Sequence, residues 1–111
     1  MTPEQHAAVE AVYRDLSEQL AWPRDSGIKR DPWTWHQMML AAYARYKGWH
    51  ILLLPSLDGS GMEPVYRQKQ SRLTVRQGAE LKHFARAWAI DQGVVLREPD
   101  PVEEPPLEAA P

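Results

Sequence analysis

The chain has 111 residues and a formal net charge of −2, with 13 Lys or Arg against 15 Asp or Glu. This length is typical of one domain, and the complete lack of cysteine excludes disulfides, thiolate nucleophiles and Cys-ligated zinc. No apolar run approaches the length needed to cross a membrane, and the N-terminus has no charged-then-apolar signal. We therefore expect a soluble, cytoplasmic protein without membrane contact.

Two amphipathic helices are predicted in the N-terminal half. Thr2 is suited to capping a first helix over Pro3–Ala21, in which apolar side chains recur at helical spacing. Asp31 is suited to capping a second helix over Pro32–Lys47. Residues 24–30 between them are polar and contain glycine, which predicts an exposed loop.

A hairpin and a third helix are predicted next. Trp49–Leu54 is short, apolar and followed by proline, which predicts a buried strand. Pro64–Lys69 is expected to pair with it across a Gly-containing turn. Thr74 and Gln77 have the spacing of a capping box at the start of a helix over Val75–Gln92.

The C-terminal end changes in composition. Val94–Leu96 can add a third strand, whereas residues 97–111 contain five prolines and five acids, which predicts disorder. The order of elements predicts one α+β domain over residues 1–96: three helices with a small antiparallel sheet, made of the hairpin plus an optional C-terminal strand. A disordered, acidic, proline-rich tail is expected to follow at 97–111.

The strongest functional signal is a run of basic side chains from Arg67 to Arg86. It contains six Lys or Arg against one acid, Glu80, which gives about five net positive charges in a chain that is acidic overall. The run surrounds the predicted start of the third helix, where phosphate oxygens can meet cationic side chains and backbone N–H groups. A solvated basic face without a ligand is the alternative. The residues predicted to bind phosphates are Arg67, Lys69, Arg72, Arg76 and Arg86, and Lys82 is placed beside the polar face of the helix.

Two tryptophans open the second predicted helix. Trp33 and Trp35 are two residues apart, so they point to different sides, and only Trp35 joins the apolar stripe. An exposed Trp33 can stack on a base, which makes it a DNA-binding candidate, or it can pack against the first helix. The sequence leaves both interpretations open.

No motif indicates catalysis. The four histidines, His6, His36, His50 and His83, are scattered without the HExxH or HxH spacing of metal sites. The chain has no GxSxG, Walker or GxGxxG motif, and Gly59-Ser60-Gly61 suits a hairpin turn better than a phosphate cradle. We therefore expect no catalytic residue, no metal and no cofactor.

Three stretches follow one another in a recognisable order. Residues 16–22 read LSEQLAW, residues 31–42 begin DPWTW and end AA, and residues 70–75 read QSRLTV ahead of Glu80-Leu81 and Gly93-Val94. They resemble the VSRQVEW, DAESW…AAL and (T/S)SRMxV…E…GV segments of NinB, also called Orf, a family of lambdoid phage recombination proteins. Order and approximate spacing agree from about Gln5 to Leu96.

The resemblance implies a homodimeric, non-catalytic accessory protein of phage-type homologous recombination. Such a protein binds single-stranded or tailed DNA and assists recombinase loading, with host single-strand-binding protein and a recombinase as further partners. The resemblance also implies DNA-binding roles for Arg72, in its SR motif, and for Gln5, at the start of the first helix. Relative to the family, a strand-bearing segment before the first helix is expected to be missing.

Two other functions stay open. One is a non-catalytic protein–protein interaction module of phage or prophage origin, whose basic face meets an acidic protein. The other is a metal-dependent nuclease that relies on acidic residues and on His50, which directly precedes the predicted first strand. Salt-sensitive DNA binding separates the first from a DNA-binding protein, and metal-dependent cleavage would support the second.

Overall fold

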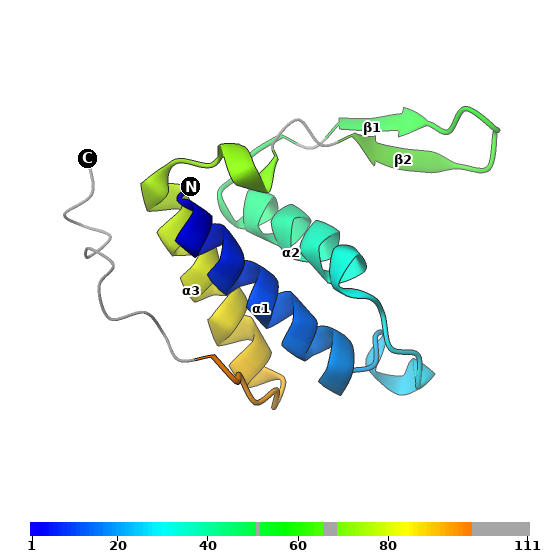
Figure 1. Cartoon of the computed structure of the whole chain (residues 1–111). Coiled ribbons are helices and arrows are strands. Elements are labelled where there is room, and N and C mark those ends of the chain that lie inside the picture. The colour runs from blue at the N-terminus through cyan, green and yellow to red at the C-terminus, as the bar shows by residue number, and fades with distance from the viewer. Residues whose placement is uncertain (51, 66–68, 99–111) are drawn as a thin grey trace.

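The computed structural model describes residues 1–50, 52–65 and 69–98 (Figure 1). Three α-helices and a two-stranded antiparallel sheet confirm the predicted α+β architecture. Two short 3₁₀ helices, η1 and η2, precede α2 and α3. In chain order the elements are α1 (Pro3–Gln19), η1 (Arg24–Ser26), α2 (Pro32–Tyr46), β1 (Leu52–Pro55), β2 (Met62–Val65), η2 (Gln70–Arg72) and α3 (Val75–Asp91).

All three α-helices begin at the predicted residue because their caps are local. Thr2 accepts a hydrogen bond from the backbone N–H of Gln5 and Thr74 accepts one from that of Gln77, and both glutamines complete a capping box. Asp31 accepts a hydrogen bond of 2.7 Å from the backbone N–H of Thr34. The helices end one or two residues earlier than predicted.

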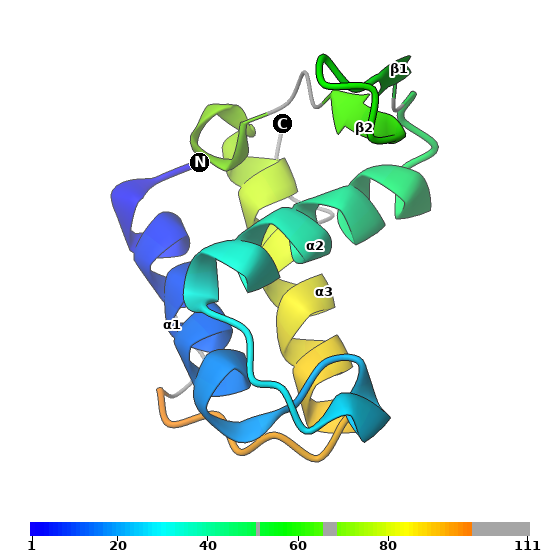
Figure 2. The same cartoon turned by 90° about the vertical axis from the view of Figure 1, so that its right-hand side faces the viewer.

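The core lies where α1 packs against both α2 and α3 (Figure 2). Each helix contributes one buried stripe, because apolar side chains three or four positions apart share a helix face. The largest fully buried apolar side chains are Trp35, Tyr13, Tyr43, Leu16, Leu73, Leu81, Val9 and Val12.

The hairpin projects away from the three helices (Figure 1). Strands β1 and β2 pair with Leu52 opposite Val65 and Pro55 opposite Met62. The prediction of a buried strand over Trp49–Leu54 was wrong, because β1 begins three residues later and three of its four residues are exposed. Every residue of β2 is exposed as well.

The optional third strand does not form in the part of the C-terminal segment that the structure describes. Residues 94–96 instead run along α1, where the side chain of Gln19 both donates to the carbonyl of Val95 and accepts from its N–H, at 2.8 Å each. Arg97, assigned to the predicted tail, contacts Asp15 at 2.6 Å and Glu18 at 2.6 Å and so belongs to the packed body. The predicted tail beyond Glu98 lies outside the described residues.

Within the described ranges, no helix combines the length and apolar character needed to cross a membrane.

Candidate nucleic-acid interface

A short 3₁₀ turn, η2, is fixed to the helical body by one buried side chain, Gln70. Its amide oxygen accepts a hydrogen bond of 2.8 Å from the hydroxyl of Tyr13 on α1. Its amide nitrogen lies 3.2 Å from both Glu10 Oε1 and His6 Nδ1. The terminal amine of Met1 also donates to the carbonyl of Leu73, directly after η2. These contacts hold η2 in a fixed position against the helical core.

Three of the predicted phosphate contacts surround this turn. Lys69 immediately precedes η2, Arg72 ends it, and Arg76 occupies the first turn of α3, and all three residues are exposed. We call these three residues the basic edge. The positive end of the α3 dipole lies at the same place, which adds to the attraction for an anion.

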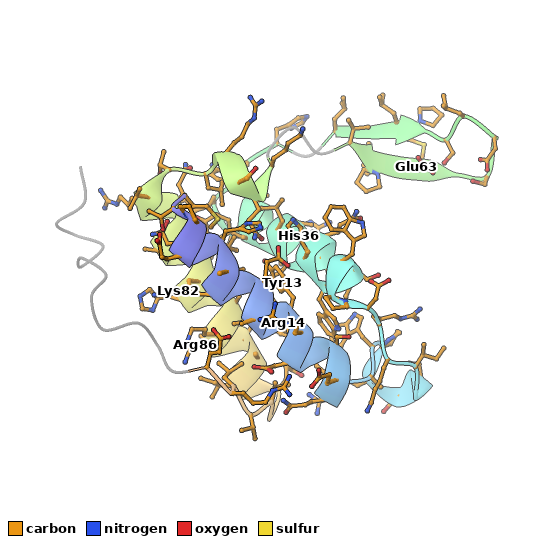
Figure 3. The ribbon with its side chains drawn as sticks, in the orientation of Figure 1. Tyr13, Arg14, His36, Glu63, Lys82 and Arg86 are labelled. Carbon is orange, nitrogen blue, oxygen red and sulfur yellow. The ribbon has the colours of Figure 1, made fainter. Side chains whose placement is uncertain are left out.

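The remaining basic candidates do not join the basic edge. Arg67 lies outside the described residues. Arg86 is ten residues beyond Arg76, which is about 15 Å along a helix. It donates a hydrogen bond of 3.2 Å to the carbonyl of Glu98 and lies on the side of the molecule away from the hairpin (Figure 3).

The prediction that Lys82 lies beside the polar face of α3 was wrong, since Lys82 is buried. It follows Gly78 by one turn and precedes Ala85 by almost one turn, and both of those residues face the interior. Small side chains on either side of Lys82 bring that part of α3 close to its neighbours.

Gln5 lies inside the protein. Its amide oxygen accepts from the N–H of Thr2 at 2.9 Å, and its amide nitrogen donates to the carbonyl of Val75 at 2.8 Å. A Cβ atom at Gly78 would lie only 2.5 Å from the Gln5 oxygen, so glycine is required for this approach. Gln5 thus joins the starts of α1 and α3, and a direct DNA contact by this residue stays a prediction.

A pocket of about 420 Å³ opens beside the basic edge, between α1, α2 and η2. Trp33 is 62% exposed at its rim, and its ring centroid lies 4.8 Å from that of His36. Trp33 is therefore accessible to a ligand, and stacking of a base on it stays a prediction. The pocket is lined by His6, Trp33, His36, Gln37, Leu40, Lys69, Gln70 and Ser71.

Hydrogen bonds fix the tautomers of the two pocket histidines. Burial raises the pKa of Tyr13 well above its ordinary value, with the charge of Glu10 adding to the effect, so Tyr13 keeps its proton and donates to Gln70 Oε1. Gln70 Nε2 is then a donor, and His6 Nδ1 must accept from it. His36 Nδ1 lies 2.7 Å from Glu10 Oε1, an acceptor, so Nδ1 carries a proton and donates it to this carboxylate.

Sequence reasoning did not single out this network. His6 and Glu10 are four residues apart on α1, and Trp33 and His36 are three apart on α2, so each pair shares a helix face. This helical spacing was the feature of the sequence from which the two pairs could have been predicted. The link to Gln70 joins segments about 60 residues apart and has no local signature. Figure 3 shows Tyr13 and His36 together between α1 and α2, and their ring centroids are 5.5 Å apart.

His50 lies elsewhere, in a separate hollow with Arg45, Trp49 and Leu53. Across residues 1–50, 52–65 and 69–98, no group of three or more His, Asp or Glu side chains is placed to hold a metal ion.

The fold and the site define a class of small α+β protein: a three-helix body with a projecting hairpin, a basic edge and an adjoining aromatic pocket. Residues 2–97 match the family model described as NinB protein, and the chain belongs to the NinB family.

A solved structure described as "Structural Genomics, NinB" is similar to this one, with a TM-score of 0.65 and 26% sequence identity. The alignment covers 87% of this chain and 62% of that chain, so this chain spans less than two thirds of the solved one. Comparison with curated proteins gives no match.

Proposed function

We propose that this protein is a non-catalytic DNA-binding accessory protein of phage-type homologous recombination. It binds single-stranded or tailed DNA through the basic edge and assists recombinase loading. Host single-strand-binding protein and a recombinase are the protein partners that this role requires.

The observation that carries the proposal is the placement of Lys69, Arg72 and Arg76. All three are exposed, and they lie beside η2, which Gln70 fixes to the core, and in the first turn of α3 that follows it. A phosphate backbone needs cations held at an accessible edge, because the gain comes from releasing condensed counterions. Arg72 has the added advantage of a planar guanidinium that can hold a phosphate with two hydrogen bonds.

The test is the affinity of a fluorescent single strand and of its duplex at about 50 and 200 mM salt. Three phosphate contacts predict a fall in single-strand affinity of about 20-fold over that range. Arg72→Ala is expected to weaken binding at low salt by about five- to tenfold and to reduce the salt dependence.

Lys29→Ala is the matched control. It removes the same charge from an exposed residue in the loop after α1, at the end of that helix away from η2 (Figure 1). Equal losses in the two variants would contradict a localised site. An absence of binding at low salt would overturn the DNA proposal and favour a protein interaction module.

We also propose that the protein is a homodimer joined through the hairpin. A two-stranded hairpin has little stability by itself in water. This one nevertheless exposes Leu53, Leu54, Met62 and Val65, at 57%, 45%, 60% and 40%. A second copy would cover Leu53 and Met62, which share one face of the hairpin, and stabilise the strands that carry them.

A further inference from the structure

The pocket beside Trp33 combines features that the basic edge alone does not have. Its volume of about 420 Å³ falls within the range of about 300–1,000 Å³ that small-molecule sites occupy. Trp33 presents an indole at the rim, and the adjacent His36 ring is inclined to it by 34°. Lys69, which also lines the pocket, belongs to the basic edge. A flat aromatic surface and a cation therefore share one hollow.

The polar groups of the pocket suit the edge of a base. Because His36 Nδ1 donates to Glu10, Nε2 is the ring nitrogen left to meet a base: it accepts from an N–H group when the ring is neutral and donates to a carbonyl when the ring is protonated. Gln37 adds an amide, which can donate and accept, and Ser71 adds a hydroxyl. Every nucleobase has a polar edge with hydrogen-bond donors or acceptors. It also has a flat face that can stack on an aromatic ring.

We propose that this pocket binds one unstacked nucleobase of a single strand, with the base stacked on Trp33 and its phosphate on Lys69. The proposal rests on the DNA-binding function above, because the basic edge must first hold the strand. It goes further in making the base itself a ligand, with His36 and Gln37 at its polar edge.

Single-strand preference follows from this pocket. Bases in a duplex are already stacked and paired, so bringing one to Trp33 requires the energy of unstacking, whereas a single strand offers its bases at little cost. Phosphate contacts at the basic edge alone would give no such preference for single-stranded over duplex DNA.

The experiment compares two single-stranded oligonucleotides of equal length, one of ordinary deoxynucleotides and one with abasic sites throughout. Both carry the same phosphates, so only the bases differ. Wild-type protein is expected to bind the ordinary strand about tenfold more tightly at low salt, the gain typical of one stacked base. Trp33→Ala should remove this preference, and Trp33→Phe should keep part of it. His36→Phe, which retains a ring without nitrogen, should reduce it.

Two controls separate base binding from backbone binding. Arg72→Ala should weaken both strands equally and so preserve the ratio. Tyr46→Ala removes another exposed aromatic side chain, at the far end of α2, and should also preserve the ratio. Trp33 is mostly exposed, so its replacement is expected to leave the fold intact, which circular dichroism would verify.

The outcomes distinguish the two proposals. Equal affinity of the wild type for both strands would overturn the base pocket and leave the DNA-binding proposal standing. A preference that survives Trp33→Ala would also overturn the pocket. Failure to bind either strand at low salt would overturn both.

Discussion

Gln70 shows how much of the candidate interface depends on one buried amide. Its side chain contacts Tyr13, Glu10 and His6, and it is almost completely buried. Gln70→Leu keeps the size and removes every polar contact, leaving the Tyr13 hydroxyl buried without its acceptor. We expect the free energy of unfolding to fall by about 2 kcal/mol, measured by urea denaturation.

The same variant permits a double-mutant cycle. Tyr13→Phe removes the other partner, so the double variant Tyr13→Phe/Gln70→Leu should lose less than the sum of the two single losses. Gln37→Leu, on the exposed side of α2, is the matched control and should change stability by less than about 0.5 kcal/mol. Strict additivity in the cycle would contradict a direct role for this hydrogen bond.

At the scale of elements, α2 and α3 are joined by one shared carboxylate. Glu80 Oε1 lies 2.6 Å from the hydroxyl of Tyr43 and 2.8 Å from the ammonium of Lys47. The hydrogen bond from Lys47 lowers the pKa of Glu80 below its ordinary value, and the hydrogen bond from Tyr43 adds to this. Burial raises the pKa of Tyr43, with Glu80 contributing, so the tyrosine stays a donor.

This contact predicts a loss of stability in acid. Because the pKa of Glu80 is lower in the folded state, the unfolded chain binds the proton first as the pH falls below the ordinary value of 4.5. The contribution is therefore complete at neutral pH and is lost as the pH falls through the folded pKa. Glu80→Gln should cost about 1 kcal/mol at pH 7 and flatten the stability profile below pH 4.5.

Denaturation midpoints between about pH 7 and pH 3 test this prediction. The matched control is Glu63→Gln on the exposed strand β2, a carboxylate without an ion pair among the described residues. It should keep the wild-type profile. A Glu80→Gln profile as steep as that of the wild type would show that other carboxylates govern the acid transition.

Helix starts could be predicted from the sequence because capping is local chemistry. Thr2, Asp31 and Thr74 each accept a hydrogen bond from a backbone N–H three residues ahead, and that arrangement is visible in the letters alone. The burial of β1 was mispredicted for the opposite reason. A run of leucines is equally compatible with a core strand and with an exposed strand that awaits a partner.

The candidate site also has one part that could be predicted from the sequence and one part that could not. The basic edge was predictable because Lys69, Arg72 and Arg76 are close in sequence, and a charge run marks them. The pocket was not predictable, because it forms only where α1, α2 and η2 meet in the folded protein. The contact between His36 and Glu10 likewise depends on the packing of α1 against α2. Trp33 was predicted as a base-stacking candidate, but the pocket around it was not predicted.

At the scale of the whole molecule, the two faces of the hairpin differ. Side chains alternate along each strand, so Leu53 and Pro55 share one face with Met62 and Pro64, and this face is wholly apolar and exposed. The other face includes Glu63. Proline lacks a backbone N–H, so Pro55 and Pro64 each remove a donor that edge-to-edge pairing would need. A second copy is therefore expected to pack on the apolar face.

The proposed dimer gives a prediction that separates these faces. Leu53→Lys places a charge on the apolar face and should weaken dimerisation by about 100-fold, because an unpaired ammonium would be buried between the copies. Leu54→Lys, the matched control, places the same charge on the other face, opposite Glu63, where an ion pair can form, and should leave the dimer intact. Sedimentation equilibrium measures both. A monomeric wild type, or equal effects of the two variants, would contradict packing through this face.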